Sequence, residues 1–203
     1  MQLPLAARHS LLTTPPSMAE HSDAELMALF RKEDTRHYAF NLIVRTYQKR
    51  LYAFVRRMVT DPDETQDVLQ NVFLKAWTGL GRFREDAQLY SWLYRIAHNE
   101  SITHIKRMRR GLFVGESSVI ERLTTTLDSS EHFSGDIIQK KLQKAVMTLP
   151  TKQRAVFTMK YFEEMKYEQM STITGTSVGA LKASYHIAVK KIEAHLTRPD
   201  QTM

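Results

Sequence analysis

Apolar residues recur at spacings of three and four through most of this 203-residue chain, and that period constrains the fold to helices. The clearest instance is the stretch 36–59, whose apolar positions are Phe40, Ile43, Val44, Tyr47, Leu51, Phe54, Val55 and Met58. Only seven glycines and six prolines occur in the whole chain, which favours helices over a turn-rich sheet protein. We therefore expect an all-α fold.

Local signals predict where several of these helices begin. Ser22 followed by Glu25 is typical of a capping box, and the helix should run to about Arg31. Asp61 and Pro62 suit the cap and first residue of a helix that continues to about Leu80. Further helices are expected at about 36–59, 89–110, 137–147, 151–162, 166–173 and 177–196. We expect disorder in residues 1–17 and fraying of the tail 198–203.

Charge is distributed unevenly along a chain whose net charge is +7. Residues 81–110 carry seven basic and three acidic groups, and residues 137–203 carry eleven and five. Between them, residues 111–136 carry one basic and five acidic groups. Stretch 111–135 lacks a clean period and is rich in Ser, Thr and Gly, which predicts a flexible acidic linker between two small helical domains, 18–110 and 136–197. Two basic blocks favour a polyanionic partner.

The chain lacks the residues that several classes of function require. The chain has no cysteine, which excludes disulfides and thiol nucleophiles and favours a cytoplasmic protein. Its eight histidines form no HExxH motif, and no glycine-rich phosphate loop occurs, so we expect no enzyme activity, metal or cofactor. No apolar run reaches about 18 residues, so membrane insertion is not expected.

Residues 167–182 have the pattern of a helix-turn-helix: a helix, a tight turn at Gly175 and a second helix that Ser177 can cap. In such motifs the second helix lies in the major groove of DNA, which small residues at its start would allow. The alternative is an ordinary helical hairpin with a solvated basic face. Candidate DNA contacts are Ser177, Val178, Gly179, Ala180, Lys182, Ala183, Ser184, His186 and Lys190.

A second candidate site lies in residues 63–110, where an acid-capped helix leads through a loop with aromatic and arginine residues into a helix that starts Tyr90-Ser91-Trp92-Leu93-Tyr94. Exposed aromatics beside positive charge suit unpaired bases, because every base has a face to stack on and a phosphate to neutralise. Trp92 shares part of a helix face with Leu93 and Ile96, so a place in the core is an equal alternative for its ring.

Together these segments resemble regions 2 and 4 of the sigma-70 family of bacterial transcription initiation factors, and the short form resembles its extracytoplasmic-function (ECF) group. The resemblance implies partners: core RNA polymerase through its clamp coiled coil and flap, promoter DNA, and an anti-sigma factor. It implies polymerase contacts at Asp67, Gln70, Asn71 and Lys75. It implies −10 DNA contacts at Arg82, Phe83, Arg84, Tyr90, Trp92, Arg95, Asn99, His104, Lys106 and Arg107, and −35 contacts on the second helix of the helix-turn-helix. The run 178–186 resembles ECF members from Bacteroidetes-type bacteria.

Two other functions remain open from the residues alone. A repressor or activator would use only the C-terminal helix-turn-helix and should bind a palindrome by itself, usually as a dimer. A helical adaptor for a protein partner should show no salt-dependent affinity for DNA, and the two basic blocks argue against it.

Overall fold

The computed structural model describes residues 21–83, 88–111 and 137–197. The predictions of disorder in 1–17, of a linker at 111–135 and of a frayed tail at 198–203 therefore fall outside the described residues, apart from residue 111. The chain divides into two compact units, residues 1–46 and residues 47–203, and each is described by itself below. Both predicted basic blocks belong to the second unit.

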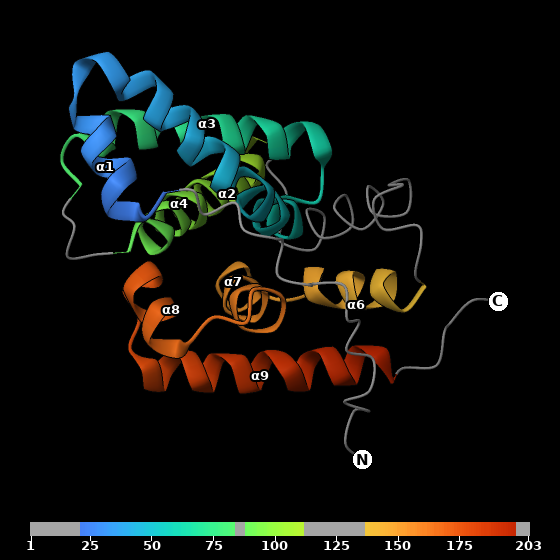
Figure 1. Cartoon of the computed structure of the whole chain (residues 1–203). Coiled ribbons are helices and arrows are strands. Elements are labelled where there is room, and N and C mark those ends of the chain that lie inside the picture. The colour runs from blue at the N-terminus through green and yellow to red at the C-terminus, as the bar shows by residue number, and fades with distance from the viewer. Residues whose placement is uncertain (1–20, 84–87, 112–136, 198–203) are drawn as a thin grey trace. The chain divides into compact units, whose positions relative to one another are not determined.

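Every regular element in the described ranges is helical, which confirms the predicted all-α fold (Figure 1). The α-helices are α1 (Asp23–Arg31), α2 (Arg36–Val59), α3 (Pro62–Leu80), α4 (Leu89–Gly111), α6 (Ile137–Met147), α7 (Thr151–Phe157), α8 (Tyr167–Thr174) and α9 (Val178–Leu196). A short 3-10 helix, Glu33–Thr35, precedes α2. The helix predicted at 151–162 is α-helical only to Phe157 and continues as a π-helix over Thr158–Phe162.

In the first unit, the predicted capping box is present at the start of α1. The backbone N–H of Ser22 donates to the Glu25 carboxylate at 2.6 Å, and the Glu25 N–H donates to the Ser22 hydroxyl at 3.3 Å. The hydrogen bonds that Ser22 donates to the Glu25 carboxylate, from its backbone N–H and its hydroxyl, lower the pKa of that carboxyl. Along α1, Phe30 lies 6.5 Å from Phe40 between ring centroids and fixes the helix against the start of α2.

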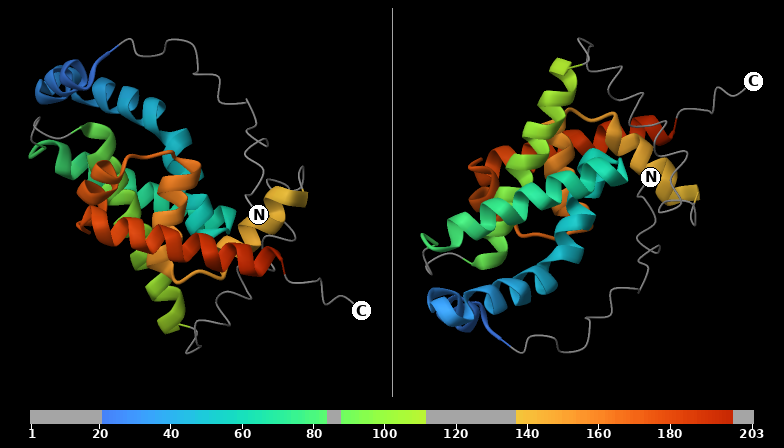
Figure 2. Two further views of the ribbon diagram at one scale, coloured as in Figure 1. Left: turned by 90° about the horizontal axis from the view of Figure 1, so that it is seen from below. Right: turned by 90° about the horizontal axis from the view of Figure 1, so that it is seen from above.

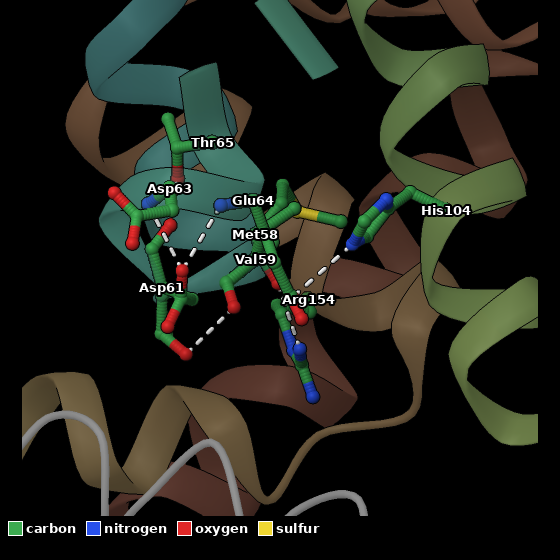
Figure 3. Close-up of polar contacts among 9 residues, drawn as sticks. Met58, Val59, Asp61, Asp63, Glu64, Thr65, His104 and Arg154 are labelled. Atoms are coloured by element: carbon green, nitrogen blue, oxygen red, sulfur yellow. Dashed lines mark hydrogen bonds and ion pairs between the residues drawn. The ribbon is translucent and has the colours of Figure 1, made fainter. Parts of the chain in front are cut away.

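In the second unit, all of the last four carbonyls of α2 accept hydrogen bonds, as buried helix ends require. Thr60 provides two of these bonds, through its backbone N–H at 2.9 Å and its hydroxyl at 2.7 Å. The other two come from the C-terminal part of the chain. Gln143 Nε2 donates to the Arg57 carbonyl at 3.1 Å. Arg154 Nη1 donates to the Met58 carbonyl at 3.0 Å (Figure 3).

Arg154 is 1% exposed and also donates to the carbonyl of Met147, at the end of α6, at 2.7 Å. One guanidinium therefore closes the C-terminal ends of two helices. These carbonyls satisfy Nη1 and Nη2 of the buried guanidinium, which offsets part of the cost of removing its charge from water.

The C-terminal helices enclose their own core. Helix α9 packs against α6, α7 and α8 (Figures 1 and 2). The buried cluster consists of Ala145, Val146, Met147, Leu149, Phe157, Ala188 and Ile192. Burying such side chains provides roughly 25 cal/mol for each Å² of apolar surface removed from water, which keeps α9 in a fixed orientation.

Candidate functional site

Helix α3 carries an exposed polar stripe, and its members are Asp67, Gln70, Asn71 and Lys75. Lys75 is not independent of the neighbouring helix, since its Nζ lies 2.5 Å from the Glu100 carboxylate on α4. Leu74 lies within the same stripe with 58% of its surface exposed. Sequence reasoning missed this residue, although its spacing of four from Gln70 places it on the same side of the helix.

The start of α3 is fixed by Asp61, whose carboxylate accepts the backbone N–H groups of Asp63 and Glu64, both at 2.9 Å (Figure 3). The same cap that the sequence predicted is therefore present. His104 Nε2, on α4, lies 3.1 Å from the Glu64 carboxylate. His104 was predicted to contact DNA, and in this structure its ring joins α3 to α4.

The predicted base-stacking aromatics do not form one exposed surface. Phe83 is 7% exposed, and its ring centroid lies 5.3 Å from that of Trp92. Trp92 is half-buried and its indole covers Gly79, where an added Cβ would lie only 2.9 Å from Trp92 Cζ2. Trp92 thus packs partly in the fold without being fully buried, and its stacking on a base stays a prediction.

Tyr90 and Tyr94 start a chain of aromatic rings that leads into the core. Their centroids are 4.4 Å apart, and Tyr94 in turn lies 5.4 Å from Phe54 on α2. Tyr90 is half-buried, whereas Tyr94 is fully buried and donates a hydrogen bond from its hydroxyl to Glu163. Burial raises the pKa of both phenols. Tyr90 is therefore the tyrosine of this pair that retains exposed ring surface.

The polar and cationic candidates near these rings are mostly exposed. The exposed ones are Arg82, Arg95, Asn99, Lys106 and Arg107, while Arg84 lies outside the described residues. Arg95 donates a hydrogen bond from its Nη2 to the carbonyl of Thr172, the residue before Ile173 on α8. One of the five N–H donors of this guanidinium is therefore occupied within the fold.

The helix-turn-helix has the predicted geometry. Gly175 ends α8 with φ +68°, the left-handed conformation that glycine adopts without steric cost. Ser177 caps α9 by accepting the N–H of Ala180 at 3.3 Å. Met170, Ile173 and Leu181 are buried, so the two helices are joined by the apolar contact that the sequence predicted.

One side of α9 is open to solvent. The exposed predicted DNA contacts are Ser177, Gly179, Ala180, Lys182, Ala183, His186 and Lys190, and the half-buried ones are Val178 and Ser184. Leu181, Ala188 and Ile192 face the core from the opposite side of the helix. The exposed side is therefore basic and lined by small residues near its start.

Within the described ranges, no group of His, Asp and Glu side chains is placed to hold a metal ion. In the same part of the chain, no helix is both long and apolar enough to cross a membrane.

Comparison with known proteins identifies both halves of this architecture. The family description "Sigma-70 region 2" matches residues 43–111, and "Sigma-70, region 4" matches residues 139–192. RNA polymerase sigma-H factor of Pseudomonas aeruginosa is 30% identical over 195 residues, which cover 88% of this chain and 96% of the relative. The ECF RNA polymerase sigma-E factor of Escherichia coli K12 is 27% identical, covering 85% of this chain and 93% of that protein.

Two solved structures share the fold. CnrH, solved in complex with the cytosolic domain of CnrY, matches with a TM-score of 0.61 at 23% identity, covering 84% of this chain and 94% of CnrH. The sigma factor RpoE, solved with the anti-sigma factor NepR from Bartonella quintana, matches with a TM-score of 0.61 at 20% identity. The match covers 78% of this chain and 97% of RpoE. Both regions are present in one chain, and the relatives match it over most of its length. The protein therefore belongs to the sigma-70 family of RNA polymerase sigma factors, in its ECF group.

Proposed function

We propose that different surfaces of this promoter-specific transcription initiation factor bind the polymerase, the −10 element and the −35 element. The factor binds core RNA polymerase and directs it to promoters, with region 2 melting the −10 element and region 4 reading the −35 element. Three surfaces carry these tasks: the polar stripe of α3, the aromatic and basic side of α4, and the exposed side of α9. The observation that carries the proposal is the open, basic side of α9 behind a correctly formed turn at Gly175.

The polymerase surface is the stripe of α3, which includes Leu74. Burial of the exposed Leu74 side chain on binding would remove apolar surface from water and so favour the complex. Asp67, Gln70 and Asn71 lie before it on the same helix, with exposed groups that can form hydrogen bonds. Lys75 contributes by holding Glu100 and so aligning α3 with α4.

The −10 surface uses the exposed side chains of α4. Capturing an unstacked base costs a few kcal/mol, and stacking on an aromatic ring returns about 1–3 kcal/mol per base. Tyr90 and Trp92 retain partly open ring surface for this purpose. Arg82, Lys106 and Arg107 supply exposed charge for phosphates. Phe83 packs against Trp92, with 5.3 Å between the ring centroids. His104 orients α4 through its contact with Glu64 on α3.

The −35 surface is the exposed side of α9, placed in the major groove as the second helix of a helix-turn-helix. Gly179, Ala180 and Ala183 carry little or no side chain, so the helix can approach the bases closely. His186 and Lys190 follow on the same side with groups that can reach base edges or phosphates. Each surface alone binds weakly, and because the polymerase links them, their binding free energies combine in the holoenzyme.

The partners extend to a regulator. Because RpoE was solved with the anti-sigma factor NepR, we propose that an anti-sigma protein also binds this chain. The factor acts on polymerase in the cytoplasm. It performs no catalysis of its own, since the polymerase supplies the chemistry of RNA synthesis.

In vitro transcription tests this function. Bacterial core polymerase with this protein, supplied with a pool of genomic promoter fragments, should give transcripts that share a start-site spacing. A double substitution of Gly179 and Ala183 by Glu should abolish them, since it places negative charge on the side that enters the groove. If core polymerase fails to bind the protein while the protein alone protects a palindrome, it is a repressor.

A further inference from the structure

Lys75 on α3 and Glu100 on α4 form an ion pair that joins the two packed helices. Lys75 Nζ lies 2.5 Å from Glu100 Oε1, and 25 positions separate the two residues in the chain. The Lys75 side chain is 60% exposed, whereas that of Glu100 is only 14% exposed. Within the described ranges, neither side chain forms another ion pair. The Glu100 carboxylate is therefore held against α3.

Glu100 differs in charge from the other ionised residues of its helix. Helix α4 has five basic residues, and Glu100 is its only acidic one. A carboxylate on a helix that approaches DNA would repel the phosphates and weaken binding. Lys75 neutralises this charge locally and so reduces the repulsion. An acid at this position therefore suits contact with α3 better than contact with DNA.

Two further contacts join α3 to α4, and both use residues that are candidates for binding DNA. Trp92 covers Gly79 near the start of α4, and His104 Nε2 lies 3.1 Å from the Glu64 carboxylate further along the helix. Either contact would change if its residue of α4 turned toward a base or a phosphate. Glu100 is not such a candidate, so its contact with α3 can persist while DNA is bound.

The position of α4 relative to α3 matters because the two helices carry different proposed surfaces. The polymerase stripe lies on α3, and most of the −10 candidates lie on α4. Stacking requires that the face of an unpaired base meets the face of an aromatic ring. The rings of α4 must therefore stand in a fixed place relative to the helix that binds polymerase.

We propose that Glu100 is a positioning residue for opening of the −10 element, and that Lys75 acts with it rather than as a contact to polymerase. The pair fixes the middle of α4 on α3, so that α3 presents the −10 surface in one orientation. Lys75 then differs from the rest of the α3 stripe, which remains the polymerase surface. This inference rests on the proposed −10 function of α4.

The test measures core affinity and promoter opening separately, in holoenzyme reconstituted from bacterial core polymerase and the full chain. A fluorescence titration gives the affinity of each variant for core. Permanganate reactivity of thymines in the −10 element, at saturating factor, gives the equilibrium constant for opening. Lys75→Gln and Glu100→Gln should each lower that constant about twofold to fivefold, the range expected for a partly exposed ion pair. Core affinity should stay within about twofold of wild type, because the pair contributes less than 1.4 kcal/mol.

Exchanging the two charges separates the effect of the pair from the effects of its single charges. The double variant Lys75→Glu/Glu100→Lys restores an ion pair and should regain most of the wild-type opening. Glu100→Lys alone brings two ammonium groups together and should open promoters less well than wild type, although it adds positive charge to α4. Lys75→Arg should keep opening near wild type, because a guanidinium can bind the same carboxylate.

Asp67→Asn is the comparison variant on the same stripe of α3. It should lower core affinity, because Asp67 remains part of the polymerase surface, whereas the two Gln variants should not. Since opening is measured on factor that is bound to core, a variant that has lost its fold is recognised by its failure to bind.

The possible failures are distinguishable. If wild-type holoenzyme binds promoters but opens none, the −10 function itself is wrong. If Lys75→Gln loses core affinity while Glu100→Gln opens promoters normally, Lys75 is a polymerase contact and the positioning role is refuted. If Glu100→Lys alone opens promoters as well as the double variant does, the charge of α4 controls opening, and the role of the pair is refuted as well.

Discussion

The hydroxyl of Tyr94 donates a hydrogen bond to the carboxylate of Glu163 at 2.7 Å, although 69 positions separate the two residues in the chain. Tyr94 is fully buried on α4, and the Glu163 side chain is 10% exposed just after the π-helix. Arg57 Nη1 approaches the same carboxylate at 3.7 Å and its guanidinium lies 4.4 Å from the centroid of the Phe162 ring. A polar cluster therefore joins region 2 to the segment ahead of the helix-turn-helix.

Tyr94→Phe should lower the free energy of unfolding by about 2 kcal/mol, because a hydrogen bond to a charged, buried acceptor is lost while the ring remains. Urea denaturation of the free factor measures this change. Tyr161→Phe is the control, since the Tyr161 ring is 51% exposed and its change should stay within about 0.5 kcal/mol. Equal effects of the two substitutions would show that the Glu163 bond adds no stability.

Glu163→Gln should alter how stability depends on pH. Burial raises the pKa of Glu163 from its ordinary value of 4.5, against the opposing hydrogen bond from Tyr94 and the charge of Arg57. The folded state therefore binds this proton more tightly than the unfolded chain does. The carboxyl's contribution to stability is complete below pH 4.5 and is lost as pH rises through the raised pKa.

Relative to wild type, the Gln variant should thus gain stability between pH 4 and pH 8, by about 1.4 kcal/mol for each unit by which the pKa is raised. Paired urea titrations at the two pH values give the difference directly, and the other carboxyls cancel in the comparison. A relative loss for the variant at high pH would mean that Arg57 outweighs the burial of the carboxylate.

Asp61→Ala should destabilise the fold by about 1 kcal/mol, because two backbone N–H groups at the start of α3 lose their acceptor. Asp61→Asn keeps an oxygen acceptor in the same place and should change stability by only a few tenths of a kcal/mol. Comparing the denaturant midpoints of the two variants distinguishes the stability that comes from the capping hydrogen bonds from the stability that comes from the charge of Asp61. A large loss in the Asn variant would assign the effect to charge instead.

Gly79→Ala should move the indole of Trp92, since the new Cβ would lie 2.9 Å from Cζ2 and 3.3 Å from Cη2. Alanine alone would favour the helix by about 1 kcal/mol, so any net destabilisation measures the clash. Trp92 fluorescence, recorded in a Trp77→Phe background, should shift with the substitution.

Gly81→Ala provides the matched control for Gly79→Ala. Nothing lies within 4 Å of a Cβ at Gly81, so both fluorescence and stability should be retained. An unshifted spectrum for Gly79→Ala would show that the indole is not held against α3. Opening of the −10 element should weaken in the Gly79 variant if Trp92 stacks on a base.

Helix limits could be predicted from the sequence because each depends on a few neighbouring residues. Asp61 before Pro62, Ser177 before Val178, and Gly175 between two apolar runs are local signals, and all three caps are present. The period of apolar residues similarly identifies Met170, Ile173 and Leu181 as buried. Local chemistry determines these features, so no knowledge of distant segments is needed.

The remaining features depend on segments that are far apart. Phe83 occupies a loop next to Arg82, where exposure was the natural expectation, but the Trp92 ring covers it. Burial of Arg154 requires two helix ends to meet at one point, which no spacing along the chain reveals. The π-helix at Thr158–Phe162 is equally unexpected, since its residues fit an ordinary helix. DNA and polymerase contacts of the individual site residues remain predictions.

The shared guanidinium of Arg154 also sets an order of events during synthesis. Its bond to the Met58 carbonyl spans 96 positions, so the last turn of α2 leaves the ribosome with two carbonyls still bonded to water. Contacts between such distant positions form late, because the intervening chain must close a large loop. The end of α2 is therefore completed only after α7 has emerged, and chains released before residue 154 should leave this turn open to hydrogen exchange.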